Sequence, residues 1–278
     1  MAADAGLGAG HDALYEFVRR HPRLFVLTGA GCSTASGIPD YRDETGAWKH
    51  RRPVSYADFV GSAAVRRRYW ARALVGWRRI AGARPNAAHH AMAALEARGA
   101  VGCVVTQNVD GLHQRAGARN VIDLHGRLDR VGCLGCGLAL ARDDVQRLLA
   151  AWNPAFAELA AGEAPDGDAR LEGCFDDFRV PDCPCCGGVL KPDVVFFGEN
   201  VPRPRVQAAE AALAAADAML VVGSSLMVFS GYRFAQGARR LGKPVAAVNR
   251  GRTRADELLA LKLEDDCGAA LSGLVGRL

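Results

Sequence analysis

Two pairs of cysteines have the spacing of metal ligands. The first is Cys133-Leu-Gly-Cys136-Gly and the second is Cys183-Pro-Cys-Cys186-Gly. Two intervening residues let both thiolates of a pair reach one tetrahedral ion at about 2.3 Å. The glycine after each second cysteine permits the left-handed turn that such a loop needs. Four thiolates leave no open coordination position, so the sequence predicts one structural Zn²⁺ rather than a catalytic metal.

Cys185 complicates the second pair, because it is also a possible ligand. Cys183 with Cys186 repeats the spacing of the first pair and its following glycine, which favours that choice. Buried or disulfide-bonded cysteines are the alternative, but two matched pairs are typical of zinc. Nine cysteines, with only these two metal-type pairs among them, also suit a reducing compartment better than a disulfide framework.

A glycine turn follows the apolar run 24–28. Gly29-Ala30-Gly31 would let backbone amides approach a diphosphate, and a following helix would attract it. Thr34 stands where the dinucleotide fingerprint of an ordinary dehydrogenase has its third glycine. The turn alone is therefore weak support for a nucleotide site, and a hydride-transferring dehydrogenase is not supported.

Polar residues also follow two other apolar runs. Gln107, Asn108 and Asp110 come after the run 101–106, and His125 comes after 121–124. An imidazole titrates near neutrality, so a histidine at a strand end suits general-base catalysis. The residues alone do not choose between His113 and His125, and structural capping is the alternative for each.

The elements that must position these residues alternate between strands and helices. This order predicts an α/β fold with a Rossmann-like, doubly wound parallel sheet, which binds ligands beyond the carboxyl ends of its strands. The expected strands are 24–28, 101–106, 121–124, 218–222 and 245–248, and the expected helices are 11–20, 87–97 and 207–216.

Two segments interrupt the alternation. In the first, Val65, Tyr69, Ala73 and Trp77 recur at helical spacing; the second holds both cysteine pairs, and its stretch 161–173 reads as a loop. We therefore predict a Rossmann-like nucleotide-binding domain and an inserted small zinc-binding and helical domain. The first comprises residues 1–40, 89–125 and 196–278; the second combines the helical insertion 41–88 with the zinc-binding module 126–195.

Composition limits the remaining classes. The 278 residues are 50% hydrophobic, without an apolar run long enough to cross a bilayer, so we expect no membrane partner. The net charge of +5 is concentrated in 49–52 and 66–68, and such runs usually form solvated faces, so nucleic-acid binding is not expected. The start of the chain lacks the features of a signal or transit peptide, and we expect a cytoplasmic location.

Several longer strings resemble the sirtuins, a family of NAD-dependent protein-lysine deacylases. Residues 29–42, GAGCSTASGIPDYR, resemble the first sirtuin signature; 106–113, TQNVDGLH, resemble the second; and Leu124-His125-Gly126 resembles the catalytic histidine motif. The strings 223–225 and 249–251 and the late Cys267 match further NAD contacts, and the cysteine pairs fall where the family has zinc. The resemblance covers almost the whole chain.

The resemblance implies a reaction that consumes NAD as a cosubstrate. The acyl oxygen of a modified lysine attacks C1′ of the nicotinamide ribose, nicotinamide leaves, and the acyl group passes to ADP-ribose. An alternative, protein mono-ADP-ribosyl transfer, uses the same electrophile with another nucleophile. A non-catalytic NAD or zinc-ribbon binding module is a further alternative, against which His125 and Asn108 argue.

The resemblance also implies roles for individual residues. The catalytic residues would be His125, Asn108 and Asp110. The NAD-binding residues would be Gly29, Ala30, Gly31, Ser33, Thr34, Ile38, Pro39, Asp40, Tyr41, Arg42, Trp48, Gln107, Asn108, Val109, Asp110, His125, Gly223, Ser224, Ser225, Asn249, Arg250, Gly251 and Cys267. The acyl-lysine protein or peptide substrate would contact Tyr69, Arg72, Val194, Val195, Phe196, Phe197, Gly198 and Glu199.

The preferred acyl group stays open between acetyl, succinyl or glutaryl-type, and lipoyl-type chains. Tyr69 and Arg72 lie three residues apart on the expected helix, and a Tyr-x-x-Arg pair reads the distal carboxylate in sirtuins that remove succinyl and malonyl groups. The strings 68–72, 75–77, 164–168 and 190–198 resemble the mitochondrial branch credited with lipoamidase, methylglutaryl-type deacylase and ADP-ribosyltransferase activities. That branch carries the pair without a strict preference for succinyl.

Overall fold

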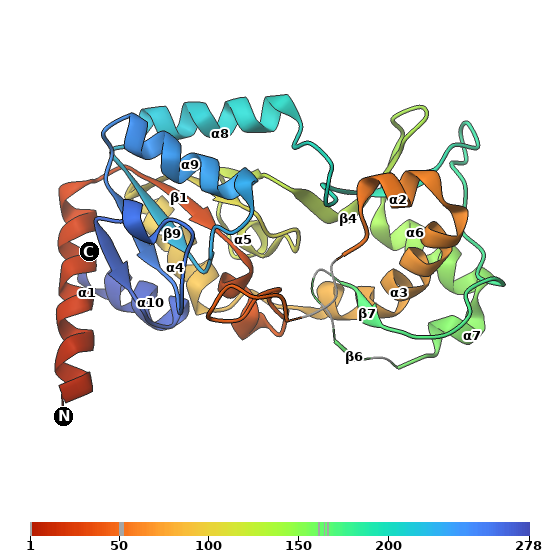
Figure 1. Ribbon diagram of the computed structural model, residues 1–278, viewed down its shortest axis with the longest axis horizontal. Helices are drawn as coiled ribbons and strands as arrows, with labels where there is room; N and C mark the ends of the chain where they lie inside the picture. Colours follow the sequence, from red (N-terminus) through yellow and green to blue (C-terminus); the bar gives the residue numbers. More distant parts are fainter. Residues whose placement is uncertain (1, 50–52, 161, 164, 166) are drawn as a thin grey trace.

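The computed structural model describes residues 2–49, 53–160, 162–163, 165 and 167–278, which form two parts lying end to end (Figure 1). Within these ranges no helix is both long and apolar enough to cross a membrane. Most of the expected basic run 49–52 lies outside the described residues, as do positions 1, 164 and 166.

The larger part is built on a six-stranded parallel sheet, which confirms the predicted α/β class. The strand order is β11-β10-β9-β1-β2-β3. The bounds are β1 (Leu24–Thr28), β2 (Val101–Thr106), β3 (Val121–Asp123), β9 (Ala218–Val222), β10 (Val245–Val248) and β11 (Leu261–Leu263). The chain runs outward from β1 to β3 and then returns to β9 on the other side of β1. A crevice therefore opens beyond the carboxyl ends of β1 and β9, where the strand order reverses.

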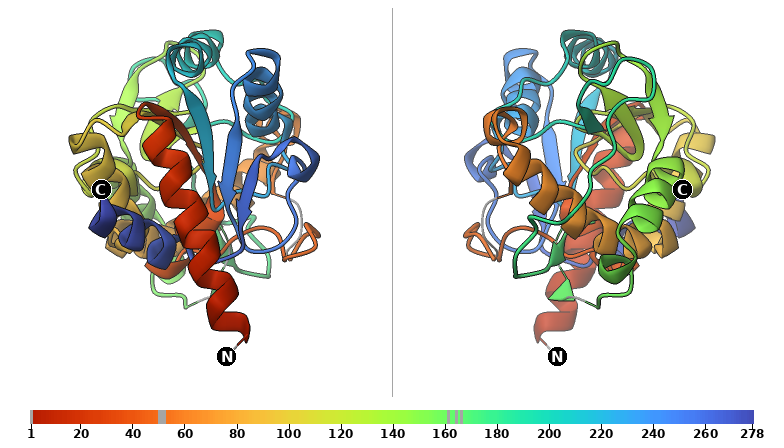
Figure 2. Two further views of the ribbon diagram at one scale, coloured as in Figure 1. Left: turned by 90° about the vertical axis from the view of Figure 1, so that its left-hand side faces the viewer. Right: turned by 90° about the vertical axis from the view of Figure 1, so that its right-hand side faces the viewer.

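Helices cover both faces of this sheet, as Figure 2 shows. Leu24 and Val26 of β1 belong to one hydrophobic cluster, and Phe25 and Leu27 belong to another on the opposite face. The first face is covered by α1 (Ala2–Arg20), α4 (Ala87–Ala97) and α10 (Cys267–Arg277), and the second by α8 (Arg203–Ala215) and α9 (Phe229–Arg240). Because both faces are buried, the inner strands β1, β2, β9 and β10 are almost continuously apolar rather than alternating.

The smaller part combines helices with an antiparallel sheet of order β5-β4-β8. Its elements are α2 (Tyr56–Gly61), α3 (Ala63–Gly82), β4 (Gly126–Cys133), β5 (Ala139–Ala141), α6 (Arg142–Trp152), α7 (Pro154–Ala157) and β8 (Leu190–Val194). The buried face of α3 centres on Trp70, Leu74 and Trp77, whereas Val65 and Tyr69 of the predicted stripe are only half-buried. A four-residue repeat drifts around a helix of 3.6 residues per turn, which accounts for the offset.

The segment 161–173 was predicted to be a loop, and its described residues contain a short hairpin instead. The hairpin joins β6 (Gly162–Glu163) to β7 (Ala169–Arg170) and packs against α3. Gly167 has a left-handed φ of 69°, which the turn between these strands requires. The remaining short elements are η1 (Ala30–Cys32), η2 (Thr34–Ser36), α5 (Leu112–Arg115) and η3 (Asp256–Leu258).

Candidate active site and metal centre

The structure brings together the four cysteines chosen from the sequence. The sulfur atoms of Cys133 and Cys186 are 3.5 Å apart, and those of Cys136 and Cys183 are 3.7 Å apart. All four sulfurs lie within 4.8 Å of one another. A tetrahedral ion with ligand distances of about 2.3 Å would hold its sulfurs roughly 3.8 Å apart. The cluster therefore fits a structural Zn²⁺ without rearrangement of the backbone.

Two further observations agree with this assignment. Cys185 is exposed and outside the cluster, as the matched spacing predicted. The backbone N–H groups of Cys136 and Gly135 donate to the sulfur of Cys133, and they help to lower the pKa of that thiol to about 6. Amides that stabilise the thiolate also favour metal binding, because the thiolate is the ligand.

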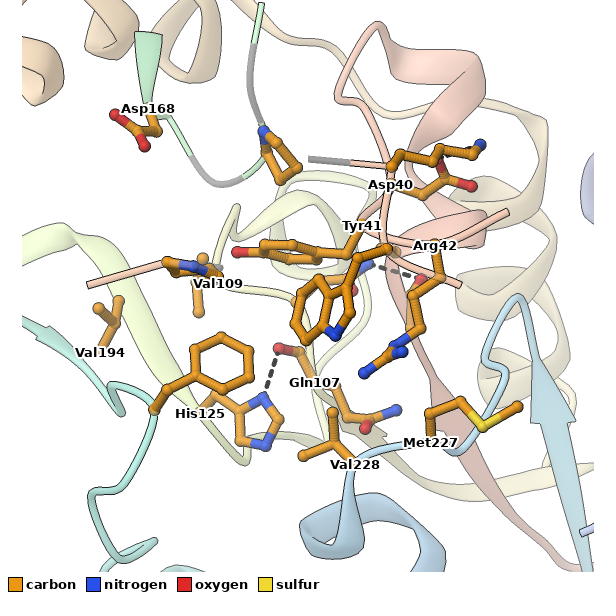
Figure 3. A pocket seen from close by; sticks show the side chains of 18 of the residues that line it. Asp40, Tyr41, Arg42, Gln107, Val109, His125, Asp168, Val194, Met227 and Val228 are labelled. Atoms are coloured by element: carbon orange, nitrogen blue, oxygen red, sulfur yellow. Dashed lines mark hydrogen bonds and ion pairs between the residues drawn. The ribbon is translucent and has the colours of Figure 1, made fainter. Parts of the chain in front are cut away.

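A large cleft lies between the two parts, beyond the carboxyl ends of the parallel strands (Figure 3). Its volume is about 1930 Å³, whereas a pocket for a single drug-sized molecule typically measures roughly 300–1,000 Å³. The cleft therefore has room for a dinucleotide together with a modified side chain. The predicted residues that line it are Gly29, Ala30, Gly31, Thr34, Asp40, Tyr41, Arg42, Trp48, Tyr69, Arg72, Gln107, Asn108, Val109, His125, Val194, Val195, Phe196, Phe197, Gly198, Glu199, Gly223, Ser224, Ser225, Asn249, Arg250 and Cys267.

His125 lies between β3 and β4 with its ring held at both nitrogens. Nδ1 is 3.0 Å from the carbonyl oxygen of Gln107, and Nε2 is 2.8 Å from Oγ of Ser230. A carbonyl oxygen only accepts, so Nδ1 carries the proton and Nε2 of the neutral ring presents a lone pair. Burial lowers the pKa of His125 to about 4, against the opposing effect of the Gln107 carbonyl. At neutral pH this imidazole is thus uncharged and able to accept a proton at Nε2.

His113, the other candidate, is enclosed below the cleft. Its side chain is 1% exposed, and its Nε2 is 2.9 Å from the hydroxyl of Thr28. That hydroxyl donates to Thr106, so the imidazole must donate to it. Burial, with a smaller contribution from His89, lowers the pKa of His113 to about 3. Of the two histidines that the residues alone left open, only His125 lines the cleft.

The floor of the cleft is formed by two glycine turns in close contact. Gly31 donates its backbone N–H to the Gly223 carbonyl at 2.9 Å, and a Cβ on Gly223 would lie 2.3 Å from the backbone nitrogen of Cys32. Glycine is therefore required for the turn after β1 to meet the turn after β9. Backbone amides at such a turn are suited to contact phosphate oxygens.

Side-chain amides fix the next segment, which follows β2. The Asn108 amide nitrogen donates to the Gly29 carbonyl at 3.0 Å and to Oγ of Ser33 at 2.9 Å. The Gln107 amide nitrogen donates to Oγ of Ser224 at 2.7 Å. These bonds tie the strand ends of β1, β2 and β9 into one rigid wall.

Aromatic rings cover one side of the cleft. Trp48 packs edge-on against Tyr41 and Phe197, with ring centroids 6.0 Å and 5.6 Å away. The Arg42 guanidinium lies 4.1 Å from the Trp48 ring centroid and donates to the Gly46 carbonyl, while Asp40 is paired with Lys49 at 2.7 Å. A charged and aromatic cover of this kind suits a planar or anionic ligand.

Five predicted residues do not line the cleft: Ser33, Ile38, Pro39, Asp110 and Gly251. The Asp110 carboxylate accepts from Oγ of Ser33 at 2.7 Å and from the Leu112 amide at 2.9 Å. Asp110 thus supports Asn108 through Ser33. Gly251 lies against the backbone of Glu44, where a Cβ would be 2.4 Å from the carbonyl oxygen.

The substrate residues predicted in the small part lie along the opposite wall. Val194 ends β8, which is an edge strand, and the Val195 N–H donates to the His125 carbonyl at 2.8 Å. The Glu199 carboxylate is already engaged, since it accepts from Lys191 at 2.9 Å and from the Phe196 amide at 2.8 Å.

The structure adds two residues that the sequence did not suggest. Ser230 contacts the base nitrogen of His125, and Asp168 pairs with Arg72 at 2.5 Å; both line the cleft. Each lies about a hundred residues from its partner, and no local pattern indicates either contact.

Comparisons with known proteins agree with this architecture. Residues 29–230 match the Sir2 family. The chain is 64% identical to an NAD-dependent protein deacetylase of Xanthomonas campestris pv. campestris, over 94% of this chain and 90% of that protein. It is 60% identical to NAD-dependent protein deacetylase 2 of Bradyrhizobium diazoefficiens, over 95% of this chain and 97% of that protein.

Solved structures give the same result. A Sir2 structure with a p53 peptide and NAD⁺ superposes with a TM-score of 0.79 at 30% identity, covering 95% of this chain and 97% of the other. A Sir2 bound to acetylated peptide gives a TM-score of 0.78 at 30% identity, covering 96% and 97%. The chain belongs to the Sir2 family, the sirtuins.

Proposed function

We propose that this sirtuin is an NAD-dependent protein-lysine deacylase acting on acyl-lysine proteins or peptides. The observation that carries the proposal is His125, whose unprotonated Nε2 faces a cleft large enough for a dinucleotide and a modified lysine. The names of the relatives above support NAD dependence and deacetylation. The four-cysteine cluster supports one structural Zn²⁺ at a distance from the reacting groups.

NAD would supply an electrophilic carbon, C1′ of the nicotinamide ribose, to the acyl oxygen of the modified lysine. The residues of this chain would bind and orient the two reactants. The glycine turns after β1 and β9 would let the diphosphate approach the backbone closely, and Asn108 and Gln107 would face the nicotinamide end. His125 would accept a ribose hydroxyl proton at Nε2, a role worth roughly 10²- to 10⁴-fold in rate.

Other residues would complete the two binding sites. The aromatic cover of Tyr41, Trp48 and Phe197 would exclude water from the cofactor. The backbone of 194–198 next to the edge strand β8 would bind the substrate peptide in extended form. Ser33 and Asp110 would position Asn108 from behind.

The predicted domain division and location also remain proposals. All six strands of the parallel sheet come from 1–40, 89–125 and 196–278, and the small sheet comes from 126–195, which supports that division. A cytoplasmic location is proposed from the cysteine usage. The finer resemblance to the mitochondrial lipoamidase and ADP-ribosyltransferase branch is supported by Asp168, which lies in a shared string and lines the cleft.

The experiment is to incubate the zinc-loaded protein with NAD and a panel of acetyl, succinyl, glutaryl, methylglutaryl and lipoyl peptides. Chromatography would quantify nicotinamide, and mass spectrometry would identify the peptide product. Deacylation predicts free lysine with O-acyl-ADP-ribose, and the matching unmodified peptide is the control. A protein or peptide that gains ADP-ribose would instead support mono-ADP-ribosyl transfer. Absence of nicotinamide release with every acyl peptide would refute the proposal.

A further inference from the structure

Arg72 is the residue that the Tyr-x-x-Arg resemblance would assign to an acyl carboxylate, and its guanidinium is already engaged. Nη2 donates to Oδ2 of Asp168 at 2.5 Å, and Nε donates to the Ala169 carbonyl at 2.8 Å. The Arg72 and Asp168 side chains are 28% and 34% exposed, so both are partly withdrawn from water. The Nε–Nη2 edge of the Arg72 guanidinium is therefore occupied by hydrogen bonds within the protein. The positive charge of the guanidinium is balanced by the Asp168 carboxylate.

Asp168 is held against Arg72 by its own backbone. Its Oδ1 accepts from the Ala169 amide at 2.9 Å, and its N–H donates to the Pro165 carbonyl at 3.1 Å. The turn rests directly on α3, because a Cβ on Gly76 would lie only 2.1 Å from the Gly167 carbonyl oxygen. The position of Asp168 relative to α3 is thus set by backbone contact as well as by the ion pair.

The pair belongs to the wall of the cleft on the side of the small part. Figure 3 shows Asp168 across the cleft from His125, with Val109 and Val194 between them in this view. Arg68, Arg170 and Glu172 also line the cleft. Burial raises the pKa of Asp168, while Arg72 opposes this shift, so the carboxylate relies on Arg72 for stabilisation. A second carboxylate brought to Arg72 would meet like charge in a poorly hydrated place.

Resting on the deacylase function proposed above, we infer that Asp168 determines the acyl specificity of this site. By pairing with Arg72 it disfavours acyl chains that end in a carboxylate and leaves uncharged acyl groups as the preferred substrates. Asp168 thus reverses the preference that the Tyr69-x-x-Arg72 spacing alone implies.

The first test uses the unmodified chain with two nearly isosteric acyl groups on one peptide. Succinyl-lysine ends in a carboxylate, whereas succinamyl-lysine ends in a neutral carboxamide. We expect kcat/KM to favour succinamyl by about tenfold or more, which corresponds to one charged hydrogen bond. An equal or greater kcat/KM for succinyl would overturn the inference.

The second test removes the negative charge with Asp168→Asn. The ratio of desuccinylation to deacetylation, each as kcat/KM, should rise about tenfold, and Arg72→Met in the same chain should cancel the rise. Asp176→Asn is the matched control, since Asp176 is 79% exposed and outside the cleft but makes the same change of charge. An unchanged ratio in a folded Asp168→Asn variant would contradict the inference.

Gly76→Ala provides a variant that leaves both charged side chains in place. Its new methyl group would push the Gly167 turn away from α3, so the same ratio should rise without any change of charge. This variant replaces Asp168→Asn if that protein fails to fold, and an unchanged ratio would again count against the inference. Deacetylation that continues with unaltered ratios refutes only the role of Asp168, whereas no nicotinamide release from any peptide refutes the deacylase function.

Discussion

In the cysteine cluster four thiols face one another beside the small sheet, whereas below the cleft the two imidazoles of His89 and His113 are enclosed next to the large sheet. The cluster sulfurs approach to 3.5 Å, with two of the four cysteines exposed. Burial lowers the pKa of His89 to about 4 and that of His113 to about 3, and it also lowers the pKa of His125 in the cleft. The first region thus gathers negative charge that a cation must balance, and the second excludes positive charge. Stability should depend on metal in one region and on pH in the other.

The largest effect expected from this difference concerns the cluster. Cys136→Ser removes one thiolate, and because structural Zn²⁺ contributes roughly 10–16 kcal/mol of apparent binding energy in small zinc domains, a large part of the stability of the small part should be lost. Thermal unfolding and zinc content are the measurements. Cys185→Ser is the matched control and should behave like the unaltered chain. If Cys136→Ser has the melting temperature and zinc content of the unaltered chain, the assignment of Cys136 as a zinc ligand is wrong.

The second prediction concerns turnover rather than folding. His125→Ala should lower kcat by about 10²- to 10⁴-fold on an acyl peptide, because the proton acceptor is lost. NAD binding, measured by calorimetry, and the melting temperature should change little. His90→Ala is the control, since His90 is exposed and outside the cleft. Retained turnover in His125→Ala would transfer the role of base to another residue.

The third prediction is the pH dependence of kcat/KM. As the proposed base, His125 would act when neutral, so activity should be present above its pKa and should be lost as the pH falls through it. Because burial lowers that pKa to about 4 from the ordinary 6.5, the acid limb should lie about 2.5 pH units below the value for an exposed histidine. Circular dichroism at each pH distinguishes protonation of His125 from unfolding of the protein. An acid limb at pH 6.5 or above would show that His125 is not the titrating base or that its burial does not depress its pKa.

The smallest effect is expected at His113. Its folded-state pKa is depressed, so its contribution to stability is fully present above the unfolded value near 6.5 and is lost as the pH falls toward 3. His113→Gln should cost about 1–2 kcal/mol at pH 7, because the bond to Thr28 is disturbed. The cost should shrink by pH 4.5, where the parent chain has itself been destabilised. Urea unfolding at the two pH values measures the difference, and a cost independent of pH would contradict the assigned neutral state.

The same two regions differ in how far the sequence predicts them. The spacing within each Cys-x-x-Cys pair is local, so the four clustered cysteines followed from residue types alone. The buried strands β1, β2, β9 and β10 were also predicted with their observed bounds, because continuous apolar runs end in polar or glycine residues. The cleft was harder, since it joins the ends of strands whose order in the sheet no local pattern gives.

Two contacts of the cleft could not be predicted from the sequence, because they join residues far apart in the chain. Ser230 reaches His125 across 105 residues, and Asp168 reaches Arg72 across 96 residues. Asp168 lies in the turn of a short hairpin, in a stretch whose Gly, Asp and Pro content predicted a loop, and Ser230 lies at the start of an amphipathic helix. Tyr69 and Arg72, singled out from their spacing as substrate residues, both line the cleft, but the spacing gave no information on the partner of the guanidinium.

Strand β4 connects the cleft with the cysteine cluster. It begins at Gly126, directly after His125, and ends at Cys133, so a single strand, whose pairing with β8 shifts register between Gly126 and Val131, connects the imidazole with the thiolates. Val194 of β8 pairs with its first residue, and Leu190 pairs with its last. Oxidation or chelation at the sulfur end would loosen that strand and, with it, the orientation of the ring at the other end. Oxidation or chelation of the thiols would then lower the catalytic rate through strand β4, without the reagent entering the cleft.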